Sequence, residues 1–451
     1  MDRQSIKKLE HAGISSLTRS EVGARRIKEF VANSALLASL FQWKTYQIKT
    51  KCLCWLLFIT SCLLLTIVIY NTLNGVNSLP LGGLYPFKDF LPLWSYQEIA
   101  RTHPVAELYN MATTHQRQLA LGMKPDPQNP FPYPPSFLLF IWPLGLLPYN
   151  LSYLFWILGT LSTFLFSIFK TCSRLPFALG CAIVAPVCVI NIWFAQSGFL
   201  TGALLIAGIG LATKRPILSG VLLGLLSFKP QLGLLAPLAL AAAGLWSTFA
   251  VACATVAGLG IVAAIAFGPD AWVAWVSGLP EYAEWFQKPS PGMVFKISVT
   301  DNLRMLGLAS TTAFAVQALV SAAVAYLTWV SFRRGCTRLA QAALLTGAIL
   351  ASPHTVVYDA PMVVASLILF VQERMETRAK FNLFEILIML AAFVSPALLM
   401  FTSTPFPAAT LISFMLLFIM IIISDLSLKY RRFFTAPSAL GLKNMASKPS
   451  S

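Results

Sequence analysis

Long runs of apolar residues recur along most of the chain, separated by short polar or proline-containing breaks. A helix of about 17 to 25 apolar residues is long enough to cross a bilayer. No strand-like alternation is found, and an open sheet in lipid would leave its edge groups without hydrogen-bond partners. We therefore predict an all-α polytopic membrane protein with about 10–12 transmembrane helices. The predicted spans are 53–73, 150–169, 176–192, 197–212, 216–228, 231–246, 248–267, 312–332, 339–351, 355–371, 383–401 and 407–424.

Two apolar stretches do not fit simple spans. Residues 136–148 form a run too short to cross a bilayer alone, which favours a re-entrant or interfacial segment. The short stretches 216–228 and 231–246 meet at Lys229 and Pro230, and the proline should break a continuous helix there. Lys229 would then lie at membrane depth or at the outer mouth of a cavity, where non-helical backbone must be enclosed by protein or face water.

The spans divide the chain into three predicted parts: a cytosolic basic N-terminal arm (1–52), a transmembrane domain (53–424) and a disordered cytosolic tail (425–451). Two outer loops interrupt the domain, 74–135 and 268–311, and both are rich in aromatic residues. Loops of this length usually carry structure or function of their own, and such aromatic residues are typical of the membrane interface.

Composition and charge agree with this topology. Hydrophobic residues make up 57% of the chain and charged residues 11%, with a formal net charge of +16. The positive charge does not indicate nucleic-acid binding, because most of the 33 lysines and arginines fall on one side of the predicted membrane. That side is the cytosol, with both termini, and its charges would meet anionic lipid headgroups. Eight lie on the outer side: Lys88, Arg101, Arg117, Lys124, Lys229, Lys288, Lys296 and Arg304.

Asp89 is the acidic residue that stands out. It follows the first predicted span, in the stretch Tyr85-Pro-Phe-Lys-Asp-Phe-Leu-Pro-Leu-Trp94. A carboxylate at the lipid–water boundary could act as a general base on a substrate held there. The structural alternative is a helix cap or an ion pair with Lys88.

A second group of polar residues lies within apolar sequence: His354, Tyr358 and Asp359. On a helix, His354 and Tyr358 would share a face because they are four positions apart. Lys229 supplies a cation suited to a phosphate. The structural alternatives are an interhelical hydrogen bond for His354 and a lysine that reaches to the headgroups.

Two amides, Asn191 and Gln196, flank an aromatic pair at a predicted outer helix junction. Under the predicted topology these amides, Asp89, Lys229 and His354 all fall at the outer face. Together they would equip the protein for group transfer from a lipid-phosphate donor.

The order of these segments resembles glycosyltransferase family 87. The resemblance rests on Asp89 after the first span, Glu107-Leu-Tyr109, Phe131-Pro-Tyr-Pro-Pro135, Pro143-Leu-Gly-Leu-Leu-Pro148, Ala195-Gln-Ser-Gly-Phe-Leu-Thr201, Ser227-Phe-Lys-Pro-Gln-Leu-Gly-Leu-Leu235 and Ser352-Pro-His-Thr-Val-Val-Tyr-Asp359. It runs from about residue 53 to 424. It implies the GT-C fold, and the family includes mycobacterial mannosyltransferases that use polyprenyl-phosphate mannose. Relatives often show a basic pair where this chain has Ala243-Gly-Leu245, and the Ser-Pro-His form also departs from the mycobacterial members.

The resemblance also implies residue roles. Asp89 would be the catalytic base, and Lys229 and His354 would bind the donor phosphate. The further candidates for substrate binding are Tyr358, Asp359, Gln196, Asn191, Tyr133 and Tyr109.

We expect an inner- or plasma-membrane transferase with its active site facing the periplasm or cell exterior. It would move a hexose, with mannose the first candidate, from a polyprenyl-phosphate donor to a lipid or glycan hydroxyl by an inverting, base-assisted displacement. This mechanism requires no cofactor or metal. Two alternatives stay open at this point: a flippase, polymerase or ligase of lipid-linked oligosaccharides, and a secondary transporter with broken helices.

Overall fold

The computed structural model describes residues 59, 90–121, 129–172, 176–288, 295–377, 379–399 and 407–435. Within these ranges the chain is mostly helical, and an isolated antiparallel bridge joins Lys296 to Val356. The first half contains α3 (Phe90–Thr102), η1 (Val105–Tyr109), α4 (Met111–Ala120), η2 (Pro135–Phe137), α5 (Leu138–Ile141), η3 (Trp142–Leu146), α6 (Tyr149–Ser167), η4 (Ile168–Cys172), α7 (Pro176–Val184), α8 (Pro186–Phe194), α9 (Gly198–Leu211), α10 (Pro216–Leu225), η5 (Leu226–Phe228) and α11 (Pro230–Gly233). The second half contains α12 (Leu235–Ala242), α13 (Trp246–Phe267), α14 (Pro269–Gln287), α15 (Val299–Met305), α16 (Ser310–Phe332), α17 (Arg338–Ala351), η7 (Val357–Asp359), α18 (Pro361–Glu376), α19 (Leu383–Leu398) and α20 (Pro407–Thr435).

Four of the described helical segments are long and apolar enough to span a membrane: Tyr149–Cys172, Trp246–Phe267, Ser310–Phe332 and Ala408–Ser427. Several shorter apolar helices accompany them, including Gly198–Leu211 and Arg338–Ala351. The prediction of an all-α membrane protein is therefore confirmed. The sidedness of the membrane, the position of the termini and the full number of spans stay predictions.

Several predicted boundaries need correction because prolines divide the helices. The predicted span 176–192 is two helices, α7 and α8, since α8 begins at Pro186. The predicted span 355–371 begins instead at Pro361, so His354 and Tyr358 do not share a helix face. At the other end of the chain, α20 continues beyond the predicted span end at 424 and reaches Thr435.

The predicted irregular segments are confirmed. Residues 136–148 contain parts of η2, α5 and η3, three short helical pieces rather than one helix. The break at Pro230 is also present, since η5 ends at Phe228 and α11 starts at Pro230. The described parts of the two predicted outer loops are largely helical, with α3, η1 and α4 in the first and α14 and α15 in the second.

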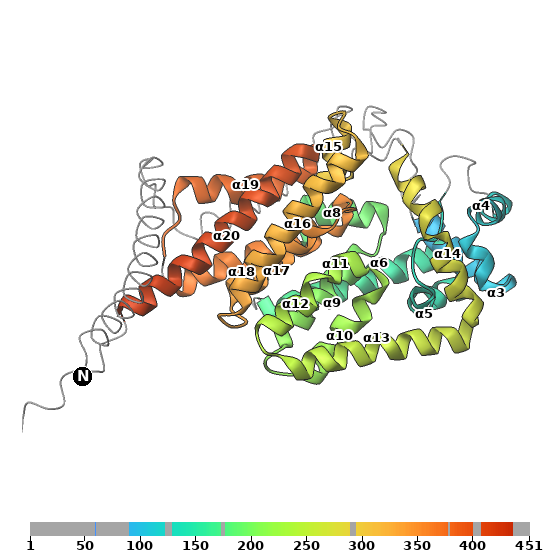
Figure 1. Ribbon diagram of the computed structural model, residues 1–451, viewed down its shortest axis with the longest axis horizontal. Coiled ribbons are helices and arrows are strands. Elements are labelled where there is room, and N and C mark those ends of the chain that lie inside the picture. The colour runs from blue at the N-terminus through green and yellow to red at the C-terminus, as the bar shows by residue number, and fades with distance from the viewer. Residues whose placement is uncertain are drawn as a thin grey trace, which may run out of the picture. The chain divides into compact units, whose positions relative to one another are not determined.

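The centre of the helical core is α17, which packs against α16, α18 and α20 (Figure 1). Most of its residues are small or medium apolar side chains with little or no exposed area. Gly347 illustrates how closely the helices approach: a Cβ there would meet Val324, Phe418 and Leu235 at 3.0–3.3 Å. Small residues allow this approach, and dispersion contacts between close helices favour association in lipid.

A second close contact joins α10 to α13. Gly220 and Gly224 lie four positions apart on α10, and a Cβ on either would come within 2.8 Å of a backbone carbonyl oxygen of α13. This is the spacing by which small residues bring two membrane helices together. The rest of α13 exposes apolar side chains such as Ile261 and Ile265, as expected of a helix that faces lipid.

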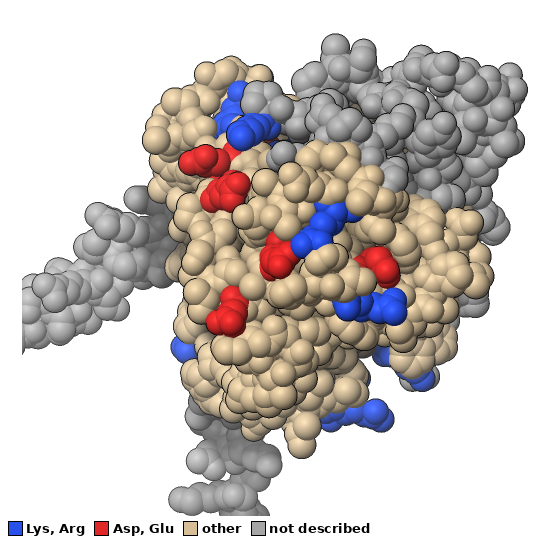
Figure 2. Space-filling view, turned by 90° about the vertical axis from the view of Figure 1, so that its right-hand side faces the viewer, with Lys and Arg blue, Asp and Glu red and all other residues tan. Residues whose placement is uncertain are grey.

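The helix α14 anchors the described part of the first outer loop. The Trp275 indole donates to the Pro132 carbonyl at 3.2 Å, and the Tyr282 hydroxyl donates to the Tyr109 carbonyl at 3.3 Å. Figure 2 views the molecule from the side on which α3, α4 and α14 lie in Figure 1. That face carries small groups of acidic and basic side chains between wide uncharged areas. Segments from the two predicted outer loops are thus held together by side-chain hydrogen bonds.

Candidate functional site

Lys229 and Asp359 form a buried ion pair. The ammonium Nζ lies 2.5 Å from the carboxylate Oδ1, and each side chain is about 5% exposed. Lys229 comes from the break between η5 and α11, and Asp359 is the last residue of η7. Either residue without the other would be an unpaired buried charge, which is energetically costly. The segments that carry Lys229 and Asp359 therefore depend on one another.

Aromatic rings surround this ion pair. Lys229 Nζ lies 5.4 Å from the centroid of the Tyr358 ring, close enough for a cation–π interaction. Tyr358 in turn packs against Phe194 at the end of α8, with centroids 5.9 Å apart. The ammonium is therefore held between a carboxylate and an aromatic face, two groups that both favour its charged form.

The turn between α8 and α9 supports η7 through very close backbone contact. Ala195 adopts a left-handed conformation (φ 52°) and ends α8. Gly198, the first residue of α9, lies so near η7 that a Cβ would be 1.8 Å from the Tyr358 carbonyl oxygen. Because Gly198 has no side chain, the turn can lie directly against η7, the element that carries Asp359 of the ion pair.

Asn191 belongs to the same turn. With its amide oriented to satisfy both neighbours, Nδ2 donates to the Gln196 carbonyl at 3.2 Å and Oδ1 accepts from the Phe199 amide at 2.9 Å. The side chain is fully buried. Asn191 thus stabilises the turn that carries Gln196 and supports η7. It does so through hydrogen bonds to backbone groups.

Tyr133 reaches the Lys229 region through a row of rings. It packs on Phe137 with centroids 4.3 Å apart, and Phe137 stacks on Phe228 at 4.8 Å. Tyr133 is also an electrostatic neighbour of Lys229. This predicted residue therefore joins the site from the first outer loop.

Tyr109 lies behind Tyr133 and donates from its hydroxyl to the Tyr133 carbonyl at 3.1 Å. Burial, with a smaller effect of the neighbouring Tyr282, raises the pKa of Tyr109 far above its ordinary value. The phenol therefore stays protonated, and its observed contact positions the Tyr133 backbone.

His354 lies in a different polar cluster from Lys229. Its segment is extended, since the Ile297 amide donates to the Thr355 carbonyl at 2.9 Å and Lys296 pairs with Val356. The imidazole stacks on Phe286 at 5.8 Å, and its Nδ1 lies 3.9 Å from the Asp301 Oδ2 atom.

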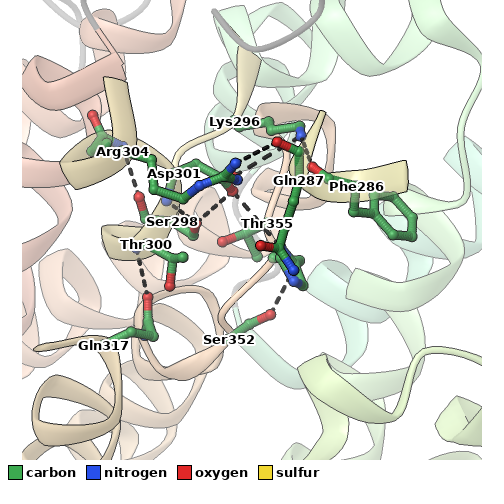
Figure 3. Close-up of polar contacts among 12 residues, drawn as sticks. Phe286, Gln287, Lys296, Ser298, Thr300, Asp301, Arg304, Gln317, Ser352 and Thr355 are labelled. Atoms are coloured by element: carbon green, nitrogen blue, oxygen red, sulfur yellow. Dashed lines mark hydrogen bonds and ion pairs between the residues drawn. The ribbon is translucent and has the colours of Figure 1, made fainter. Parts of the chain in front are cut away.

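Asp301 is the centre of this second cluster, which also contains Lys296, Ser298 and Arg304 (Figure 3). His354 belongs to the cluster through the contact of its Nδ1 atom with Asp301. The Asp301 side chain is fully buried. Its Oδ1 atom lies 4.0 Å from Lys296 Nζ and 3.9 Å from Arg304 Nη1. Ser298, the N-cap of α15, donates from its hydroxyl to Oδ2 at 2.6 Å.

The charges of this cluster shift its protonation equilibria. Burial by itself would raise the pKa of Asp301, but His354, the Ser298 hydroxyl and the Lys296 ammonium together lower it below the ordinary value. Burial also lowers the pKa of Lys296, against the opposing effect of Asp301. The Asp301 carboxylate is therefore ionised at neutral pH and supplies a negative charge beside His354.

Asp301 was missed as a candidate in the sequence. Ser298-Val-Thr-Asp301 has the spacing of a capping box, which predicts a helix start and an acid near its backbone. That local pattern contains nothing about His354, which lies more than fifty positions later in the chain. Their proximity results from the pairing of the 295–298 and 354–356 segments.

Asp89 lies outside the described residues. The next residue, Phe90, begins α3 and is buried against Tyr149 and Tyr153 with ring centroids 5.5 and 5.6 Å away. The predicted convergence of Asp89 with Lys229 and His354 stays a prediction. What the described residues provide are two polar clusters, connected in sequence by the short segment from His354 to Asp359.

Comparison with known proteins identifies the family. Residues 131–353 match the model of glycosyltransferase family 87. The matched range contains Tyr133, Asn191, Gln196, Lys229 and Asp301, and it ends one residue before His354. No curated protein and no solved structure matches the chain. The family match and the apolar helices confirm the resemblance: residues 131–353, about half of the chain, belong to glycosyltransferase family 87, a family of membrane glycosyltransferases.

Proposed function

We propose that this glycosyltransferase moves a hexose, with mannose the first candidate, from a polyprenyl-phosphate donor to a hydroxyl of a lipid or glycan acceptor. The observation that carries the proposal is the buried Lys229–Asp359 pair at a helix break. An ionisable residue within membrane-embedded protein is costly and marks a functional site by default. A buried ion pair contributes little net stability, so stability alone does not explain it.

The leaving group explains why a cation is needed there. When the bond between the sugar and the phosphate oxygen breaks, the polyprenyl phosphate carries the electron pair away, and its negative charge grows. Preorganised cations facing such charge commonly make the largest contribution to catalysis. Lys229 meets this need, and Asp359 keeps the ammonium charged and in place while no donor is bound.

The acceptor side of the reaction needs a base. In our proposal the acceptor oxygen attacks the anomeric carbon from the face opposite the phosphate, and its proton passes to the Asp89 carboxylate. The anomeric configuration inverts because attack and departure occur on opposite faces. General-base assistance typically contributes a factor of about 10² to 10⁴ in rate.

The aromatic surroundings fit a sugar and a lipid chain. The rings of Tyr133, Phe137 and Phe228 form a continuous row that ends beside Lys229. Aromatic faces provide apolar area with polar tips, which suits an amphiphilic substrate. We place this site at the periplasmic or exterior face of an inner or plasma membrane.

Transport is the weaker alternative. A flippase, polymerase, ligase or secondary transporter could also contain a broken helix with a buried lysine. The family match favours transfer, because the family consists of glycosyltransferases.

The test is direct incubation of membranes that contain the protein with defined polyprenyl-phosphate sugars, followed by identification of the product. We expect transfer by the wild type, inversion at the anomeric carbon, and no transfer by Asp89→Asn with normal protein levels. Lys229→Arg should keep more activity than Lys229→Gln because it retains a cation. Near-normal transfer by Asp89→Asn would contradict the assigned base, and failure with every polyprenyl-phosphate sugar would contradict the donor class.

A further inference from the structure

We infer that Asp301 is a positioning residue that orients the His354 imidazole through its Nδ1 atom. This inference rests on the proposed function and on the role that the family resemblance implies for His354, contact with the donor phosphate. It adds a residue to the site that the sequence motifs did not include.

The carboxylate is fixed independently of His354. The Asp301 backbone amide donates to Ser298 Oγ at 3.1 Å, and the Ser298 hydroxyl donates back to Asp301 Oδ2 at 2.6 Å. These two hydrogen bonds with Ser298 at the start of α15 therefore fix the position of the carboxylate. Oδ2 lies 3.9 Å from the His354 Nδ1 atom, within reach of a hydrogen bond after a small ring movement. Such contacts between functional groups often shorten when the substrate binds.

The ring of His354 is constrained on other sides as well. Phe286 of α14 stacks on it, and Phe314 of α16 meets it edge-on at 5.9 Å. The backbone is tied by the Ser352 hydroxyl, which donates to the His354 carbonyl at 3.0 Å. About a third of the His354 side chain is exposed, so the ring is held in place and still accessible.

A purely structural role for Asp301 would be to neutralise two cations. Its Oδ1 atom forms ion pairs with Lys296 at 4.0 Å and with Arg304 at 3.9 Å, about the distance of Oδ2 from the His354 ring. Both cations also donate elsewhere, Lys296 to the Phe286 carbonyl at 2.8 Å and Arg304 through Nη2 to the Gln287 carbonyl, at the carboxyl end of α14. That helix end favours positive charge as well. Neutralisation of the cations by Oδ1 does not account for the second oxygen, Oδ2, which is turned toward the imidazole.

The charge and position of Asp301 explain its orientation toward His354. With Nδ1 directed at a carboxylate, the proton on Nδ1 is favoured and Nε2 becomes the nitrogen available to a ligand. The negative charge also stabilises the imidazolium form, whose Nε2–H can donate to a phosphate oxygen as that oxygen gains charge. The described titratable groups around His354 are Asp301 and Arg304 on α15 and Lys296 on the preceding segment, while α14 and α16 contribute aromatic rings. Among them Asp301 alone carries a negative charge.

The first test measures transfer by Asp301→Asn as a function of pH. Removal of the negative charge beside Nδ1 should make the imidazolium form less stable. We expect kcat to fall at least about tenfold, the alkaline limb of the kcat profile to move to lower pH, and Asp301→Glu to recover part of both. In a His354→Gln background, Asp301→Asn should cause little additional loss, because the two residues act together.

A matched control is Asp425→Asn. Asp425 is another buried carboxylate, bound by Ser331 and Thr337 and paired with Arg334 at the far end of α16. Its removal should lower stability without moving the pH limb. If Asp301→Asn lowers activity equally at every pH, or equally in the His354→Gln background, its role is structural and the inference is overturned. Wild-type kinetics in either Asp301→Asn or His354→Gln would overturn it as well.

A second test does not depend on turnover. The full-length chain contains four histidines, so the rate of diethyl pyrocarbonate modification can be followed at His354 by peptide mass spectrometry. The pH dependence of that rate reports the His354 pKa. A lower midpoint in Asp301→Asn supports the inference, and an unchanged midpoint overturns it. Absence of transfer by the wild type would contradict the proposed function alone, since this measurement still decides the role of Asp301.

Discussion

Gly198 and Tyr358 come so close that a Cβ on Gly198 would lie 1.8 Å from the Tyr358 carbonyl oxygen. The two residues belong to the α8–α9 turn and to η7, and η7 ends with the Asp359 carboxylate that binds Lys229. Because Gly198 has no side chain, η7 can lie against the α8–α9 turn, and this contact positions Asp359 of the buried ion pair.

Gly198→Ala should therefore displace η7. Because the clash is with backbone, relief requires a shift of Tyr358 and Asp359, and overpacking of this kind typically costs about 1–3 kcal/mol. We expect a lower unfolding temperature in detergent and a loss of transfer activity. Gly159→Ala is the matched control, since a Cβ there has nothing within 4 Å. Equal behaviour of the two variants would show that η7 tolerates the displacement.

Neutralisation of one member of the Lys229–Asp359 pair should be more damaging to stability than neutralisation of both. Lys229→Gln or Asp359→Asn leaves one buried charge without its partner, which typically costs about 3–5 kcal/mol. The double variant removes both charges and should recover much of the unfolding temperature. It should remain inactive if Lys229 meets the donor phosphate. A double variant with wild-type transfer would mean that the pair is structural.

The pH dependence of stability should carry the signature of Asp301. Its pKa is lowered in the folded protein from an ordinary value of 3.8, so its stabilising contribution is complete above that value and is lost as pH falls through the lower, folded-state pKa. The difference in unfolding temperature between wild type and Asp301→Asn should be constant from neutral pH to about pH 5 and should shrink below pH 4. A difference that grows on acidification would contradict the lowered pKa.

The contact between α10 and α13 predicts a different kind of sensitivity. Gly224→Leu would place a large side chain against the Ala252 carbonyl oxygen, which a Cβ would already approach to 2.8 Å. We expect separation of the two helices and a loss of folded protein, measured as the monodisperse fraction in detergent. Gly258→Leu on α13 is a suitable control because a Cβ there meets nothing within 4 Å. A normal yield of Gly224→Leu would mean that the helices can separate without unfolding.

Much of the architecture was predictable because the physics is local. Runs of apolar residues specify helices in lipid, and the prolines at positions 186, 230 and 361 mark helix starts that follow from the missing amide donor. Errors occurred where an apolar run continued across such a break, as at 355–371, since hydropathy does not distinguish a helix from an extended segment that is buried by its neighbours.

The candidate residues divide along the same line. The sequence by itself determined a helical membrane protein of family 87 and selected Lys229, Tyr358 and Asp359 as polar residues whose burial would need a purpose. Only the tertiary structure decided which of them meet: Lys229 pairs with Asp359, while His354 faces Asp301. These partners are 130 and more than fifty positions apart, and an ion pair at such separation depends on how helices pack and segments pair, which no local spacing encodes.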